Sequence, residues 1–266
     1  MFRQFFTLRR IGMLLVAVAF AWATFSLGQW QFGRHEAKLA ARTAVETNYS
    51  ADPVQLSTVL TPESPELAAT SEWTAVEIEG SYLPQNQLYV RNRPFRGTYG
   101  YEVLVPFRDS AGGGTILVDR GWVENAETAS ILPDVPPAPE GTLTIHGWLR
   151  NPEIDLERDL PADQLASINT ASASKKTDLD LLPAYLELET ETTQDGQPPA
   201  RPEAADKPDT GLGSHLAYAI QWWLVVPLGF ILIGVLFRRE VLDAREAKGA
   251  VPNKPRKTRI WDEEDE

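Results

Sequence analysis

The chain has 266 residues, a formal net charge of −12 and no cysteine, so disulfides, thiolate catalysis and cysteine-bound metals are excluded. Its three histidines lie far apart in sequence, which argues against a multi-histidine metal site. Residues 34–214 hold 14 basic and 29 acidic side chains. A segment at −15 would repel a phosphate backbone, so we expect no nucleic-acid partner.

The first predicted element is a transmembrane helix over residues 11–33, preceded by a short tail, residues 1–10. The 23 residues from Ile11 to Gly33 carry no charge, and a helix needs about 20 apolar residues to cross a bilayer. A cleaved signal peptide is the alternative, because Ala21-Trp22-Ala23 resembles a cleavage site. The run exceeds the roughly 7–15 apolar residues of a signal peptide, so we expect a retained anchor.

The next segment, residues 34–191, is predicted to be a β-rich domain. Short stretches rich in β-branched and aromatic residues alternate with turn formers such as Ala111-Gly112-Gly113-Gly114. The predicted strands are residues 73–80, 87–93, 99–107, 115–123, 142–149 and 184–190. Their spacing favours a mainly antiparallel sandwich or small barrel. Residues 53–60 and 161–169 each suit a short helix, and the proline-rich residues 192–213 are typical of a flexible tether.

A second transmembrane helix is predicted over residues 214–237. The 22 residues from Leu216 to Phe237 carry no charge, and Arg238-Arg239 follow at once. Ser214 is a suitable N-cap. Pro227 removes a backbone donor inside the span, so we expect a kink there.

The positive charges beside the two spans predict the orientation. Basic residues precede the first span and follow the second: Arg3, Arg9, Arg10, Arg238, Arg239, Arg245 and Lys248. We therefore expect both chain ends in the cytoplasm, residues 34–214 outside, and a charged, distally disordered tail over residues 238–266. Arg34, Lys38 and Arg42 either weaken this orientation or continue the first helix into water.

Arginines within the acidic domain are candidates for partner contacts. Arg91, Arg93 and Arg120 are the candidates, and in strand 87–93 Arg91 and Arg93 point to the same face as Tyr89. Guanidinium groups suit carboxylates, lipid phosphates or porphyrin propionates. Ordinary pairing with surface acids is the alternative. Asp119 and Arg120 are expected on opposite faces of one strand.

Two further groups lie at the ends of the spans. Gln31, Arg34 and Lys38 share a helix face and form either a partner surface or an interfacial belt. His215, with Tyr218 and Trp222 below it on one face, either ligates a metal porphyrin or is a polar interfacial residue. No Ser-His-Asp order or paired-carboxylate spacing stands out, so we expect no enzyme activity.

Six motifs in order give the chain a family resemblance. They are Leu27-Gly-Gln-Trp-Gln-Phe-Gly-Arg34, Gly80 to Pro84 with Leu88 to Pro94, Gly100 to Pro106, Ile116 to Val123, Gly141 to Arg150, and His215 to Trp223. With the two flanking spans, they resemble the surfeit locus protein 1 family of cytochrome c oxidase assembly factors over roughly residues 11–240. Asp119 stands where that family more often has Asn, and residues 151–183 lack the expected aromatic-rich segment.

The resemblance implies a non-catalytic assembly or accessory factor for an aa3-type heme-copper oxidase. Such a factor helps heme a insertion, or stabilises the oxidase subunit that receives the heme. It implies transient contact of heme a with His215, and partnership with the catalytic subunit, a respiratory supercomplex and the bilayer. A membrane-tethered binding or scaffold module unrelated to heme is the alternative. Few residues precede the first span, which favours a bacterial plasma membrane over mitochondria.

Overall fold

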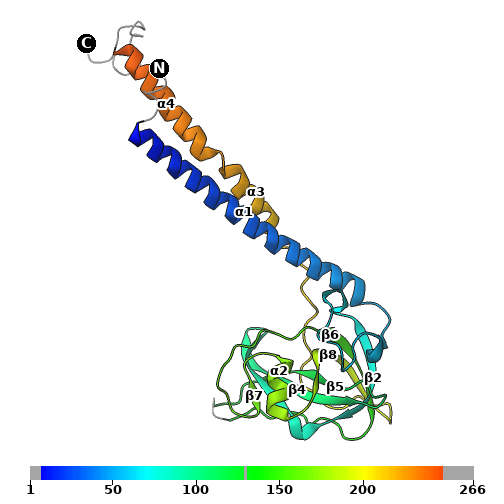
Figure 1. Ribbon diagram of the computed structural model, residues 1–266. Helices are drawn as coiled ribbons and strands as arrows, with labels where there is room; N and C mark the ends of the chain where they lie inside the picture. Colours follow the sequence, from blue (N-terminus) through cyan, green and yellow to red (C-terminus); the bar gives the residue numbers. More distant parts are fainter. Residues whose placement is uncertain (1–6, 129–130, 248–266) are drawn as a thin grey trace, which may run out of the picture. The chain divides into compact units, whose positions relative to one another are not determined.

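The computed structural model describes residues 7–128 and 131–247, which form two compact units. Of the described residues, the first unit comprises 7–38 and 212–247, and the second comprises 39–128 and 131–211. Figure 1 shows a helical unit and a β-rich unit, as predicted. Residues 1–6 and 248–266 lie outside the described residues. The disorder predicted for the C-terminal tail therefore stays a prediction.

The helical unit pairs the N-terminal helix with a broken C-terminal one. Helix α1 runs over Leu8–Asn48, with its last turns in the second unit, so the charges beyond residue 33 do continue the helix. Helices α3 (His215–Val225) and α4 (Leu228–Glu246) flank Pro227. The predicted kink is therefore present, because proline cannot donate to the preceding turn. Ser214 does precede α3, but its side chain makes no capping hydrogen bond.

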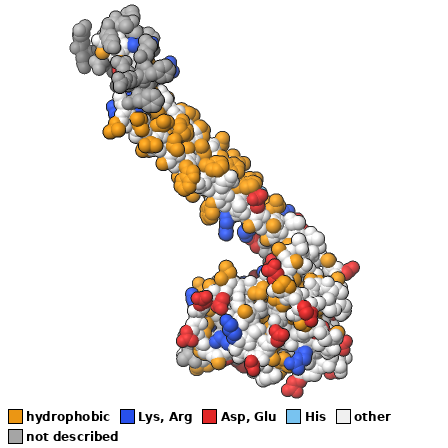
Figure 2. All heavy atoms as spheres, viewed as in Figure 1, with side chains coloured by type: hydrophobic (Ala, Val, Ile, Leu, Met, Phe, Trp, Pro, Cys, Tyr) orange, Lys and Arg blue, Asp and Glu red, His pale blue; other side chains and the backbone are white. Residues whose placement is uncertain are grey.

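Both helical segments are long and apolar enough to span a membrane. Hydrophobic side chains cover much of the visible surface of this unit, whereas acidic side chains are scattered over the β-rich unit (Figure 2). The two units therefore differ in surface hydrophobicity, as the hydropathy of the sequence predicted.

All six predicted strands are present, and two short strands join them. The strands are β1 (Val54–Gln55), β2 (Ala75–Tyr82), β3 (Leu88–Phe95), β4 (Thr98–Asp109), β5 (Thr115–Glu124), β6 (Leu143–Arg150), β7 (Gln164–Leu165) and β8 (Leu181–Thr193). They form one sheet in the order β1-β2-β6-β8-β5-β4-β3-β7.

This topology agrees with a mainly antiparallel domain but corrects the predicted sandwich or small barrel. Among the described residues, five strand pairings are antiparallel. Strand β5 pairs with β8 in parallel, as β1 does with β2 and β3 with β7, so the sheet is mixed. A three-residue ladder between β2 and β4 curls the sheet, while β1 and β7 remain as edges, so the barrel is not closed. Side-chain alternation has the same period in parallel and antiparallel strands, so the sequence pattern could not distinguish them.

The curled sheet encloses the main core on its concave face. Buried aliphatic and aromatic side chains from five strands form it, among them Val76, Val105, Phe107, Ile145 and Leu186. Helix α2 (Thr170–Thr177) covers part of the opposite face through a second cluster. Asn169 caps this helix by accepting a hydrogen bond from the Ser172 N–H.

Three connecting segments differ from expectation. Residues 161–169 contain a turn and β7 rather than a helix, and α2 begins only at Thr170, because Asn169 provides the cap. Residues 53–60 contain β1 and a single 3₁₀ turn over Leu56–Thr58. The proline-rich segment is held to the domain near its middle, where Glu203 exchanges two backbone hydrogen bonds with Trp122.

Candidate functional site

The first predicted site residues meet where α1 lies against the start of α3. His215 Nδ1 is 2.9 Å from Gln31 Oε1, although the two residues are 184 positions apart. A carboxamide oxygen only accepts hydrogen bonds, so the imidazole donates through Nδ1. A neutral ring then carries its lone pair on Nε2, the atom that can bind a metal or accept a hydrogen bond. The contact therefore fixes Nδ1 as the donor and leaves Nε2 as the free acceptor of a neutral His215 ring.

A glycine lets the helices approach just below this hydrogen bond. A Cβ atom added at Gly28 would collide with the indole ring of Trp223. The Trp223 ring also lies 5.7 Å, centroid to centroid, from Phe32, which in turn is 6.3 Å from the His35 ring. Aromatic rings at such separations attract one another. Gly28 and these rings therefore hold the two helices together beside His215.

Two polar atoms in this aromatic group are buried without a hydrogen-bond partner among the described residues. They are His35 Nδ1 and Trp223 Nε1. An unpaired buried polar atom costs roughly 1–3 kcal/mol, so native proteins rarely keep one without a reason. Trp223 packs against Gly28 and Phe32, and Phe32 packs against His35, so both atoms belong to one aromatic group between α1 and α3. The site thus has unused hydrogen-bonding capacity beside an oriented imidazole.

The face of α3 that meets α1 carries His215 but is not the face of its predicted neighbours, Tyr218 and Trp222. His215, the buried Ala219 and Trp223 follow at intervals of four residues and define the face of α3 that meets α1. Tyr218 is 49% exposed, and Trp222 is half-buried. The sequence pattern predicts Trp222, whereas Trp223 lies on the face that meets α1. Its distance of eight residues from His215, two helical steps of four, is the signal that indicates it.

Arg34 is exposed and forms no ion pair within the part of the chain that the structure describes. It does not join the hydrogen bond between Gln31 and His215. Its role as a partner contact stays a prediction.

The predicted alignment of Arg91 and Arg93 is wrong because strand β3 contains a bulge. Val90 pairs with Glu102 but Arg93 pairs with Gly100, so β3 has one extra residue in this interval, and Asn92 adopts a positive φ of 58°. An extra residue reverses which face the following side chains take. Arg93 binds Glu102 and Glu153, whereas Arg91 borders a separate small pocket beside Tyr101.

Arg120 is also a structural residue rather than an accessible partner contact. Its side chain is 0% exposed and pairs with Glu191 at 2.6 Å. Tyr82 donates its hydroxyl to the same carboxylate at 2.8 Å, and the Pro136 carbonyl accepts from the guanidinium at 3.0 Å. A partner cannot reach this guanidinium in the folded domain.

Asp119 lies on the opposite side of β5 from Arg120 and has a contrasting environment. Burial raises the pKa of its carboxyl well above the ordinary value, and the neighbouring Glu102 and Glu187 raise it further. Burial also raises the pKa values of these two glutamates, although Arg93 and Arg150 oppose the effect. A neutral Asp119 carboxyl therefore suits this site, and it resembles the carboxamide of Asn in shape and charge.

Comparison with known proteins places these features in one family. The SURF1 family model matches residues 18–226. An uncharacterized SURF1-like protein of Mycobacterium tuberculosis is 31% identical over 251 residues, 91% of this chain and 88% of that relative. Surfeit locus protein 1 of Rattus norvegicus is 26% identical over 220 residues, covering 75% and 67% of the two chains. Cytochrome oxidase assembly protein SHY1 of Saccharomyces cerevisiae is 30% identical over 106 residues, covering 40% and 26%.

The matched region contains Gln31, the whole β-rich domain and His215. Both the family model and the mycobacterial relative cover most of the chain. The family that the six sequence motifs predicted is thus confirmed, and the chain belongs to the SURF1 family.

Proposed function

We propose that this protein is a membrane-anchored, non-catalytic assembly factor for an aa3-type heme-copper oxidase. Its family supports this role, because one relative is a cytochrome oxidase assembly protein. The proposed partner is the catalytic subunit that receives heme a, alone or within a respiratory supercomplex. The function is either to help heme a insertion or to stabilise that subunit.

The hydrogen bond between His215 and Gln31 is the observation that carries the proposal. It leaves the lone pair of a neutral imidazole on Nε2, as an axial ligand of heme iron requires. The unpartnered Trp223 Nε1 and His35 Nδ1 add hydrogen-bonding capacity nearby. The donor set therefore fits a heme that is passed on as cargo, with His215 as the ligand and Gln31 as its positioning residue.

Both helical segments are proposed to cross the cell membrane, with the chain ends in the cytoplasm and the β-rich domain outside. None of the most apolar part of the α3–α4 segment is buried by protein in the described structure. A core helix of a soluble protein would be buried, so lipid is the better environment for this surface. The arginines at the chain ends support the orientation.

A scaffold module unrelated to heme is the second candidate. The exposed acidic surface of the β-rich unit favours it, since such a surface can bind a basic partner without a cofactor. This candidate gives no role to the orientation of His215.

The test is a difference spectrum of membranes from cells that lack the protein, recorded at the heme a bands together with oxidase activity. The wild-type gene should restore both signals, whereas His215→Ala and Gln31→Leu should restore neither. Gln31→Glu keeps an acceptor for Nδ1 and should restore most of the signal. His146→Ala is the histidine control, because His146 lies on a strand of the β domain and pairs with Glu189.

Each outcome separates the candidates. Full restoration by His215→Ala would keep an assembly role but remove the proposed ligand. Unchanged heme a and activity in cells without the protein would contradict the assembly role and favour the scaffold module. Immunoblots of the membrane fraction must show equal amounts of each variant.

A further inference from the structure

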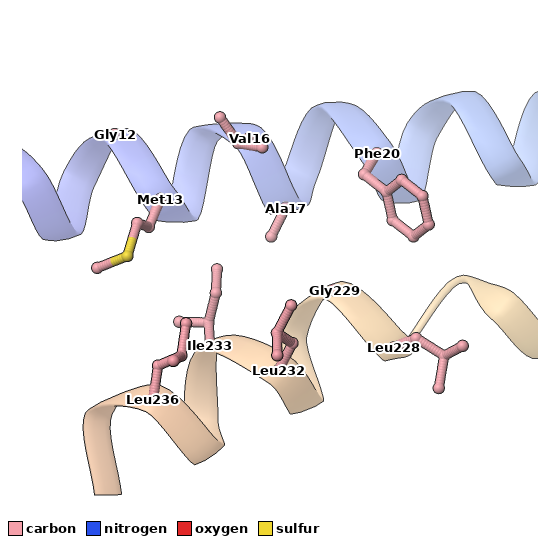
Figure 3. A pocket seen from close by; sticks show the side chains of 10 residues that line it. All are labelled: Gly12, Met13, Val16, Ala17, Phe20, Leu228, Gly229, Leu232, Ile233 and Leu236. Carbon is pink, nitrogen blue, oxygen red and sulfur yellow. The ribbon is translucent and has the colours of Figure 1, made fainter. Parts of the chain in front are cut away.

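An apolar groove runs between the N-terminal half of α1 and the helix α4 (Figure 3). Its volume is about 580 Å³. Its walls are entirely aliphatic, aromatic or thioether side chains and glycines: Gly12, Met13, Val16, Ala17, Phe20, Leu228, Gly229, Leu232, Ile233 and Leu236. Among the described residues no charged or hydrogen-bonding side chain lines it, so an apolar ligand suits it.

The groove has the length of one membrane leaflet. On α1 it extends from Gly12 to Phe20, which corresponds to about 12 Å at 1.5 Å per residue. Half of the hydrocarbon core of a bilayer measures about 15 Å. Further along α1, Thr24 and Gly28 are buried, so the groove is closed at that level. A partner helix crossing the membrane would need contact along both leaflets, whereas a lipid acyl chain needs only one.

Arginines surround the terminal end of the groove. Arg9 and Arg10 precede its first residue on α1, and Arg238 and Arg239 follow its last residue on α4. Arg10 binds Glu240 at 3.0 Å, and Arg9 lies 4.0 Å from the same carboxylate, although its side chain is 81% exposed. These four arginines and Glu240 together carry a net charge of +3. An apolar groove with a basic mouth matches an acyl chain joined to an anionic headgroup.

We infer that this groove binds an acyl chain of an anionic phospholipid, with the headgroup phosphate over Arg9, Arg10, Arg238 and Arg239. The lipid comes from the leaflet on the side of the two chain ends. It occupies the space beside the close contact of Ala17 with Gly229 and so braces the pair formed by α1 and α4. The inference rests on the membrane insertion proposed above and is independent of heme.

Two glycines allow a matched test of the groove. A Cβ atom at Gly12 or at Gly234 would meet no atom within 4 Å, so a side chain at either position begins in open space. Gly12 lines the groove and Gly234 does not. Gly12→Leu therefore adds bulk at the wall of the groove, and Gly234→Leu adds the same side chain to α4 elsewhere.

The experiment reconstitutes the full chain in phosphatidylcholine vesicles that contain a trace of photoactivatable lipid. The probe is phosphatidylglycerol with a diazirine midway along one acyl chain, and the matched probe is phosphatidylcholine with the same chain. After illumination, peptide mass spectrometry locates the adducts. We expect phosphatidylglycerol to label residues 12–20 and 228–236 severalfold more than phosphatidylcholine does. Gly12→Leu should abolish this excess, and Gly234→Leu should preserve it.

Equal labelling by the two lipids, or labelling that Gly12→Leu does not reduce, would overturn the inference. Cross-links to a protein helix in native membranes, lost in Gly12→Leu, would assign the groove to a partner instead. Carbonate extraction distinguishes a failure of the lipid site from a failure of the proposed membrane insertion. A protein that stays in the membrane but gains no excess label refutes the lipid site alone, whereas an extracted protein refutes the proposed membrane insertion.

Discussion

Arg120 and Glu191 form a 2.6 Å ion pair in the interior of the β domain, with side chains 0% and 1% exposed. Removing one partner leaves the other charge buried and unpaired, which costs about 3–5 kcal/mol. Arg120→Met should therefore strongly lower the unfolding temperature of the full chain in detergent. Tryptophan fluorescence during heating measures it.

Arg96→Met is the control for this ion pair. Arg96 pairs with Glu203 and Asp206 at the surface, where its side chain is 61% exposed, so solvent replaces its partners readily. Its unfolding temperature should stay close to the wild-type value. Equal losses in the two variants would show that burial does not determine the strength of the Arg120 pair.

Asp119 makes the stability of the domain depend on pH. Its folded-state pKa is raised by burial and by Glu102 and Glu187, while the hydrogen bond from the Gly121 N–H and the charge of Arg93 oppose the rise. The folded protein therefore keeps a proton that the unfolded chain has lost, and stability falls as pH rises from the ordinary aspartate value toward the raised one. Asp119→Asn cannot ionise, and its amide oxygen can still accept from the Gly121 N–H.

We therefore expect Asp119→Asn to raise the unfolding temperature at pH 8 and to leave it nearly unchanged at pH 4. Thermal unfolding of both proteins across this range tests the sign. Glu124→Gln, at the exposed end of β5, is the control, and it should change the unfolding temperature at neither pH. A destabilised Asp119→Asn variant at pH 8 would mean that the folded protein holds this carboxyl ionised.

The packing of α1 against α4 can be tested by a disulfide. A Cβ atom built on Gly229 lies 3.6 Å from the Ala17 Cβ, within the range of roughly 3.5–4.5 Å that a disulfide requires. The chain has no native cysteine, so Ala17→Cys with Gly229→Cys can form only this bond. We expect efficient oxidation, detected as a linked pair of peptides after proteolysis. Ala17→Cys with Gly234→Cys should stay reduced within the monomer.

Gly28→Leu added to the Ala17→Cys and Gly229→Cys pair should reduce the yield of this disulfide severalfold. Its side chain would collide with the Trp223 ring and push the helices apart. Gly33→Leu is the matched control, because a Cβ atom at Gly33 meets no atom within 4 Å. Unchanged yield with Gly28→Leu would show that the helices pair without close contact at Gly28.

Trp148 anchors the end of α1 within the β-rich unit. Its ring stacks on Tyr49 at 4.1 Å, and its indole donates to the Tyr49 carbonyl at 3.0 Å. Losing a buried tryptophan costs about 3–5 kcal/mol. Trp148→Ala should therefore destabilise the domain and speed amide exchange over residues 45–49, measured by hydrogen–deuterium exchange. Trp30→Ala removes a 60% exposed ring and should leave exchange there unchanged.

The secondary structure follows closely from the sequence. All six predicted strands are present, and Pro227 interrupts the second helix where expected. These features depend on local composition and side-chain alternation, which each segment carries by itself. By contrast, residues 161–169 do not form the predicted helix. A helix begins only at Thr170, because the side chain of Asn169 caps its first turn.

The candidate site was predicted only in part, for reasons visible at single residues. His215 and Gln31 were both chosen, but their 2.9 Å contact joins segments 184 positions apart. The choice between Trp222 and Trp223 depended on which face of α3 meets α1. In β3, one extra residue separated Arg93 from Arg91, since a bulge reverses the alternation of side chains.

The sequence by itself determined the two apolar helices, the β-rich character of the domain, the absence of cysteine chemistry and the family. Tertiary structure alone decided that β5 and β8 pair in parallel, that Arg120 is buried against Glu191, and that His215 binds Gln31. The physical reason is the range of the interactions. Hydropathy and periodicity act within one segment, whereas strand partners, burial and helix faces arise only when distant segments pack together.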